Sequence, residues 1–143
     1  MEGTRRLTRR LVRWGWGGGI ATGLLLALCA PWIGVLFSPD PEVQRLLVPV
    51  LLVAALGQPV AGVVFVLDGV LIGAGDGRYL AWGGLVVLAV YAPAAILAAL
   101  GPGGLVPVWL AMVVVFMGAR YVILTRRASG DAWLVTGALV SRA

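Results

Sequence analysis

The stretch from Gln58 to Arg78 reads QPVAGVVFVLDGVLIGAGDGR and decides how the chain folds. It is apolar for most of its length, carries one acid within the apolar part, Asp68, and ends in the glycine-rich segment GAGDGR at residues 73–78. This pattern predicts the last part of a membrane-spanning helix followed by a sharp reversal of the chain. The segments on both sides are also long and apolar, so we expect further helices to pack around it.

The composition predicts an integral membrane protein. Of the 143 residues, 61% are hydrophobic and 12% are charged, and the mean hydropathy is +1.01. Soluble domains carry roughly 25% charged residues. Half that share is too little charge to cover a surface that faces water, so we expect most of the chain to face lipid.

Charge and rare residues exclude several classes of function. The 11 basic residues are all arginine and give a net charge of +5. They stand at the ends of apolar runs, as topology signals do, and not on a nucleic-acid-binding surface. The chain has no histidine and one cysteine, Cys29. It therefore lacks the base for Ser-His or Cys-His catalysis and the usual ligands of a zinc site. We expect no enzymatic activity, no metal site, no cofactor and no nucleic-acid partner.

Four apolar runs are long enough to cross a membrane, which takes about 20 residues per helix. We predict an all-α membrane protein with a transmembrane region over residues 14–127, preceded by a basic lead-in and followed by a cytoplasmic tail. The polar turn SPDPEVQ (38–44) separates the first span from the second, and the GPGG turn (101–104) separates the third from the fourth. The predicted segments are the lead-in 1–13, the spans 14–37, 46–72, 79–100 and 105–125, and the tail 128–143.

The lead-in MEGTRRLTRRLVR has the spacing of an amphipathic helix lying on the membrane surface. Helical periodicity places Leu7, Leu11 and Val12 towards one side and most of the arginines towards the other. A cleaved signal peptide is the alternative, but the apolar run that follows is longer than the usual 7–15 residues of such a signal.

The first span carries small residues at a spacing of four: Gly15, Gly19, Gly23 and Ala27. Such a stripe is typical of a face on which another helix approaches closely. The alternative is that membrane helices simply tolerate glycine.

The arginines predict the orientation, because basic residues gather on the cytoplasmic side. They are numerous before the first span and after the fourth, and Arg78 lies in the turn between the second and third. The opposite side has Arg45 alone. We expect a multi-pass protein of the inner (plasma) membrane with both termini and the GAGDGR turn in the cytoplasm.

Asp68 is the one acid inside a predicted span. An ionisable group in a membrane helix is a candidate ion or proton site. Asp68 lies close to the turn at Gly73, however, so we favour a structural role, such as pairing with Arg78 or Arg120.

The turn itself, with Gly73, Gly75, Asp76 and Arg78, lacks the Lys-Ser/Thr pair and the preceding strand of a phosphate-binding loop. We expect its glycines to allow the reversal. We expect Asp76 to accept hydrogen bonds from the turn or from the start of the next helix.

Gln58 and Pro59 are candidates for a substrate cavity or a hinge. A proline within a helix favours a kink, and a mid-membrane amide needs a partner or water. Phe65 and Tyr91, together with Met112 and Phe116, have side chains that suit an apolar cavity. A tolerated proline and ordinary core or lipid-facing aromatics are the alternatives.

Two strings carry a resemblance to a known family. The first span ends in PWIGVLFSPDPEV (31–43), and the second continues as QPVAGVVFVLDGVLIGAGDGRYL (58–80). From about Arg9 to Ala138 the chain resembles the C-terminal portion of the MATE (multidrug and toxin extrusion) family, and most of all its DinF-type branch. The resemblance implies twelve helices in two lobes around a cavity, of which this chain holds the last four.

The resemblance also implies an antiporter that uses protons or sodium to export small amphipathic or cationic compounds. In DinF-type members the coupling acid stands on a helix that this chain lacks, and the sodium-site position of other members corresponds here to Ala61 and Gly62. We therefore expect a fragment that needs the missing N-terminal helices and is inactive alone. Alternatives are a lipid-linked-sugar flippase of the same superfamily and a non-transporting membrane subunit.

Overall fold

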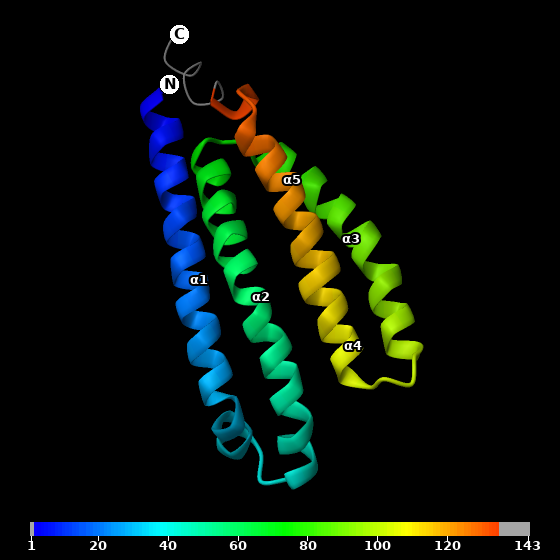
Figure 1. Cartoon of the computed structure of the whole chain (residues 1–143). Helices are drawn as coiled ribbons and strands as arrows, with labels where there is room; N and C mark the ends of the chain where they lie inside the picture. The colour runs from blue at the N-terminus through cyan, green and yellow to red at the C-terminus, as the bar shows by residue number, and fades with distance from the viewer. Residues whose placement is uncertain (1, 135–143) are drawn as a thin grey trace.

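The computed structural model describes residues 2–134. Over that range it contains only helices, turns and short irregular connections, with no strand (Figure 1). The elements are α1 (Glu2–Phe37), α2 (Pro41–Gly73), α3 (Gly77–Leu100), α4 (Leu105–Leu110), the π-helix η1 (Ala111–Met117), α5 (Gly118–Ser129) and the 3₁₀ turn η2 (Ala132–Leu134).

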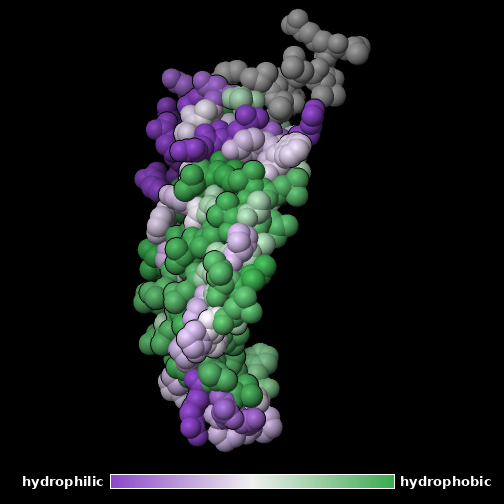
Figure 2. All heavy atoms as spheres, turned by 90° about the vertical axis from the view of Figure 1, so that its right-hand side faces the viewer, coloured by the Kyte–Doolittle hydropathy of each residue, from purple (hydrophilic) through white to green (hydrophobic). Residues whose placement is uncertain are grey.

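The prediction of an all-α protein with four membrane-crossing helices is confirmed. Four helices are long and apolar enough to span a membrane: α1, α2, α3, and the continuous span Leu105–Ser129 built from α4, η1 and α5. Figure 2 shows a broad hydrophobic band between two hydrophilic ends, as expected of a surface that meets lipid in the middle and water at both ends.

The second helix begins at Pro41, earlier than the predicted residue 46. The Asp40 side chain accepts a 2.8 Å hydrogen bond from the Glu42 backbone N–H and so caps the helix. Proline suits the first helical position because no N–H is needed there and its φ is already helical. The polar loop is therefore confined to residues 38–40.

The basic lead-in is not a separate element, because α1 runs without a break from Glu2 to Phe37. Within α1, Leu7 is 57% exposed and Thr8 is buried, so the side of the helix that packs inward carries Thr8 and not Leu7. The rotation of a continuous helix is fixed by its tightest contact, and in α1 that contact is made by glycines further along. Where this segment lies relative to the membrane surface stays a prediction.

Helices α1 and α2 pack against each other with backbone touching backbone. A Cβ built on Gly15 would lie 2.8 Å from the Gly62 carbonyl oxygen, and one on Gly23 would lie 2.6 Å from that of Ala55. A Cβ on Gly19, between them, would overlap the Gln58 carbonyl oxygen. We call this contact the glycine seam. Close approach through small residues is how membrane helices gain packing energy where no hydrophobic drive exists between them.

The N-terminal end of α1, the α2–α3 turn and the C-terminal end of α5 lie together at one end of the molecule (Figure 1). We call it the basic end. The hydrophobic core gathers near it, where buried side chains from α2, α5 and η2 meet; its members are Val63, Val64, Leu67, Leu71, Leu124 and Trp133. The loops α1–α2 and α3–α4 lie at the other end.

The fourth span contains a seven-residue π-helix, η1. It lies beside α3 and contacts α2 at Gly57, where a Cβ would come within 2.9 Å of the Val113 side chain. π-helical turns in α-helices are rare and alter which side chains face a neighbour. Hydropathy and residue spacing give no sign of this segment.

Candidate functional site

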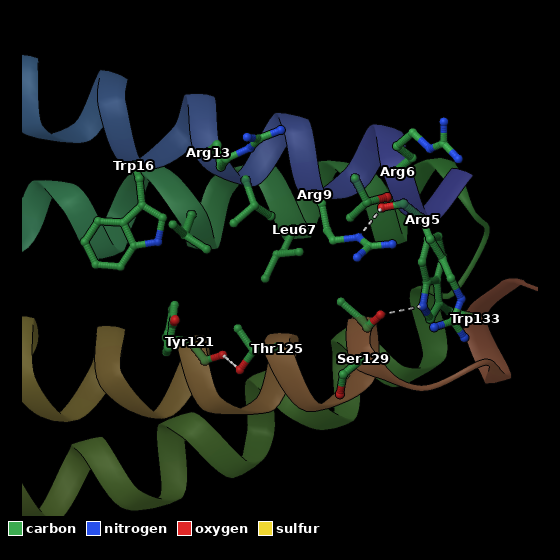
Figure 3. Close-up of a pocket in the computed structure, with 14 residues that line it drawn as sticks. Arg5, Arg6, Arg9, Arg13, Trp16, Leu67, Tyr121, Thr125, Ser129 and Trp133 are labelled. Carbon is green, nitrogen blue, oxygen red and sulfur yellow. Dashed lines mark hydrogen bonds between the residues drawn. The ribbon is translucent and has the colours of Figure 1, made fainter. Parts of the chain in front are cut away.

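A cleft of about 1010 Å³ lies at the basic end, and we call it the basic cleft (Figure 3). It opens between α1 on one side and α5 with η2 on the other, and α2 forms its floor. The residues that line it are Arg5, Arg6, Thr8, Arg9, Val12, Arg13 and Trp16 from α1, Val63 and Leu67 from α2, Tyr121, Thr125, Ala128 and Ser129 from α5, and Trp133 from η2.

The cleft carries positive charge with little to balance it. Arg5, Arg6, Arg9 and Arg13 line it, and no carboxylate of residues 2–134 does. Arg5 forms an ion pair with Asp131 at the edge. Arg9 donates a long 3.5 Å hydrogen bond to the Arg5 backbone carbonyl. Within residues 2–134, Arg6, Arg9 and Arg13 have no acidic partner.

Helical spacing explains this concentration of charge. Arg5, Arg9 and Arg13 are four residues apart, so their side chains follow one another along a single face of α1. The glycine seam turns the neighbouring face onto α2. Figure 3 shows the Arg9 side chain extending from α1 into the space before α5. The floor, by contrast, is apolar, because it is formed by Val63 and Leu67, which are buried.

Asp68 is held by Arg120 rather than facing a free cavity. Arg120 Nη2 lies 2.7 Å from Asp68 Oδ1, and Nη1 donates a 3.3 Å hydrogen bond to the Leu80 carbonyl oxygen. The Asp68 and Arg120 side chains are 22% and 16% exposed. Gly83 and Gly84 on α3 leave room for the guanidinium, which lies against them. The sequence suggested Arg78 or Arg120 as the partner of Asp68, and in the structure the partner is Arg120.

Asp76 makes the second ion pair of this region. Arg127 Nε and Nη2 lie 2.6 and 3.1 Å from the two Asp76 carboxylate oxygens, and the guanidinium stacks over the Tyr79 ring at 4.6 Å. The expectation that Asp76 would cap the next helix is wrong, since its side chain makes no capping hydrogen bond. A bidentate charge-assisted pair is stronger than a cap, so the carboxylate is drawn to Arg127 instead.

The turn that carries Asp76 is short. Helix α2 ends at Gly73, and Gly75 has φ of +77°, a conformation that favours glycine. The backbone N–H groups of Gly75 and Asp76 donate back to the last turn of α2. Arg78 is exposed and forms no ion pair within the described part of the chain.

Gln58 and Pro59 lie at the glycine seam and do not line the basic cleft. The Gln58 side-chain amide donates a 3.5 Å hydrogen bond to the Ala54 carbonyl oxygen of its own helix. Pro59 borders a second groove of about 440 Å³ between α1 and α2, lined almost entirely by aliphatic side chains.

The aromatic cavity candidates lie on different helices. Phe65 is 66% exposed on α2. Tyr91 on α3 packs edge-on against Phe116 of η1, with ring centroids 5.4 Å apart. Phe65 and Tyr91 line neither the basic cleft nor the second groove.

Sequence reasoning missed two features. The arginines of the lead-in were interpreted as topology signals and as the polar side of a surface helix, and not as residues that line a cleft. The pair between Asp76 and Arg127 has no sequence signal, because the partners lie on different helices. Among residues 2–134 no three potential metal ligands come together.

Comparison with known proteins gives two matches. A model of the MatE family matches residues 1–97. The chain is 34% identical over 127 residues to Protein DETOXIFICATION 45, chloroplastic, of Arabidopsis thaliana. That match covers 85% of this chain and 21% of the relative, so the chain spans about a fifth of the relative's length. No solved structure matches. Because the family match covers more than half of the chain, and its helices have the predicted membrane-spanning character, the protein belongs to the MatE family of membrane proteins.

Proposed function

We propose that this chain is part of a cation-coupled multidrug efflux antiporter of the DinF-type branch, which uses protons or sodium to export small amphipathic or cationic compounds. The observation that carries the proposal is the match to the MatE family over residues 1–97. The relative's name, Protein DETOXIFICATION 45, points to the same kind of activity.

We further propose that the chain supplies the last four of twelve helices and is inactive alone. Its share of the relative's length, 21%, supports this. The ion pairs of the two acids near the α2–α3 turn also support the proposal that the chain is inactive alone. Asp68 and Asp76 are each held by an arginine. Because each carboxylate already has a guanidinium partner, we expect the cation-coupling group in another part of the transporter.

The orientation we propose places the basic end in the cytoplasm of the cell, at its inner (plasma) membrane. The arginine-rich start of α1, the turn with Arg78 and the end of α5 lie at this end, and Arg45 lies near the other. The positive-inside tendency favours this direction.

The glycine seam bears on the alternative of a non-transporting subunit. That idea depends on Gly15, Gly19 and Gly23 being available to a partner helix. In the structure α2 of the same chain occupies this face, which leaves the antiporter proposal as the better supported one.

Drug susceptibility tests the proposed function in cells. A bacterial strain without its own efflux pumps would express this chain, or this chain together with the part of the DETOXIFICATION 45 relative outside the matching segment. We expect raised tolerance to ethidium only in the second strain. Unchanged tolerance there, with both parts present in the membrane and co-purifying, would count against the proposal.

A further inference from the structure

We propose that the basic cleft binds the phosphate headgroup of an anionic phospholipid, independently of transport. The ligand class is a phosphate monoester or diester that carries acyl chains. The cleft brings arginines of α1 together with apolar side chains of α1 and α2 at the basic end. Figure 3 shows the Arg9 side chain in the space between α1 and α5.

Arginines of α1 form the cationic wall of the cleft. Arg6, Arg9 and Arg13 line the cleft without an acidic partner in residues 2–134. Guanidinium groups are the side chains best suited to phosphate, because their planar donors match two oxygens at once. Basic pockets between membrane helices are typical binding sites for phosphorylated lipid headgroups.

The opposite wall shows which groups are available as donors. The Thr125 and Ser129 hydroxyls already donate to backbone carbonyls of α5, at 2.6 and 2.9 Å. The Tyr121 hydroxyl makes no hydrogen bond within the described residues and borders the same cleft. The phosphate would therefore be held by guanidinium groups from α1, with Tyr121 as one further donor from α5.

The floor distinguishes a lipid from a soluble anion. Val12 and the Trp16 ring supply exposed apolar surface in the part of the cleft nearer the middle of the bundle, above the buried Val63 and Leu67. A free phosphate would gain nothing from this apolar surface, whereas an acyl chain next to the headgroup would cover it. The volume, about 1010 Å³, is at the upper end for sites that enclose a whole drug-sized molecule, roughly 300–1,000 Å³. It accommodates a headgroup together with the first part of its chains.

Native mass spectrometry of the full 143-residue chain in detergent tests the proposal, with phosphatidylglycerol and phosphatidylcholine as probes. The test variant is Arg9→Gln with Arg13→Gln. The control is Arg10→Gln with Arg78→Gln, which removes the same charge at the same end but outside the cleft. At about fivefold per arginine, we expect the test variant to lose roughly 25-fold in phosphatidylglycerol affinity and the control less than threefold.

Three results would overturn the proposal: equal losses in the two variants, equal affinity of the unmodified chain for both lipids, or complete displacement of phosphatidylglycerol by an equal concentration of glycerol 3-phosphate. The last would make a soluble phosphate the ligand. Circular dichroism checks that each variant is helical. If the glutamine variant does not fold, Arg9→Lys with Arg13→Lys keeps the charge and should keep the preference for phosphatidylglycerol; loss of that preference in a folded lysine variant would contradict the role of the wall charge.

Discussion

The carboxylate of Asp68 lies 2.7 Å from Nη2 of Arg120, which ties α2 to α5 close to the α2–α3 turn. An acid within an apolar helix is a candidate for ion binding. In this structure its charge is already balanced, and both side chains are largely withdrawn from the surface. The pair therefore joins α2 to α5, which supports a structural role for Asp68.

Breaking this pair should destabilise the chain. We expect Asp68→Asn to lower the free energy of unfolding by about 1–3 kcal/mol, because Arg120 is left partly buried without its counter-charge. Thermal unfolding in detergent measures the loss. The control Glu42→Gln alters an exposed acid at the other end and should change stability little. Equal effects of the two substitutions would contradict the structural role.

The glycine seam should be sensitive to a single methyl group. Gly19→Ala places a Cβ against the Gln58 carbonyl, so we expect a loss of about 1–3 kcal/mol. Gly18→Ala is the matched control on the same helix, since nothing lies within 4 Å of its Cβ position. That change should be neutral or slightly stabilising, because alanine favours a helix more than glycine does. Indistinguishable melting curves for the two variants would mean that α1 and α2 do not pack as described.

The Arg127 pair with Asp76 should depend on the shape of the guanidinium as well as on its charge. Arg127→Lys keeps the charge but loses the bidentate contact and the stacking on Tyr79. We expect a loss of about 1–3 kcal/mol in the free energy of unfolding. Arg126→Lys, at the exposed neighbouring position, is the control and should have almost no effect. An unchanged free energy of unfolding in Arg127→Lys would contradict a role for the guanidinium shape.

Cysteine labelling in intact cells should report the proposed orientation. With Cys29→Ala as background, we expect Glu42→Cys to react with a membrane-impermeant maleimide added outside. Gly77→Cys should react only after the cells are permeabilised, because it lies in the turn at the basic end. The reverse pattern would place the basic end outside.

The spans were predictable because their signal is local. Uncharged runs of about 20 residues specify a membrane helix without reference to the rest of the chain. Two details were also within reach of the sequence. Asp40 before Pro41 is a helix start signal, and the repeat of Arg5, Arg9 and Arg13 places three charges on one face.

Other features depend on contacts between distant residues. The choice of Arg127 as the partner of Asp76, over a backbone cap, is made by the packing of α5 against the turn. The inward face of α1 at Thr8 follows from the glycine seam further along the helix. The π-helix η1 packs against α2 at Gly57 and against α3 at Tyr91. None of these contacts leaves a pattern in a short window of sequence.

The most direct test of the central claim is ethidium flux in inside-out membrane vesicles with an imposed proton or sodium gradient. Vesicles that contain this chain alone would be compared with vesicles that also contain the part of the DETOXIFICATION 45 relative outside the matching segment. We predict gradient-driven ethidium uptake in the second set and none in the first. Gradient-driven uptake by the 143-residue chain alone would contradict the claim that it supplies only one part of the transporter.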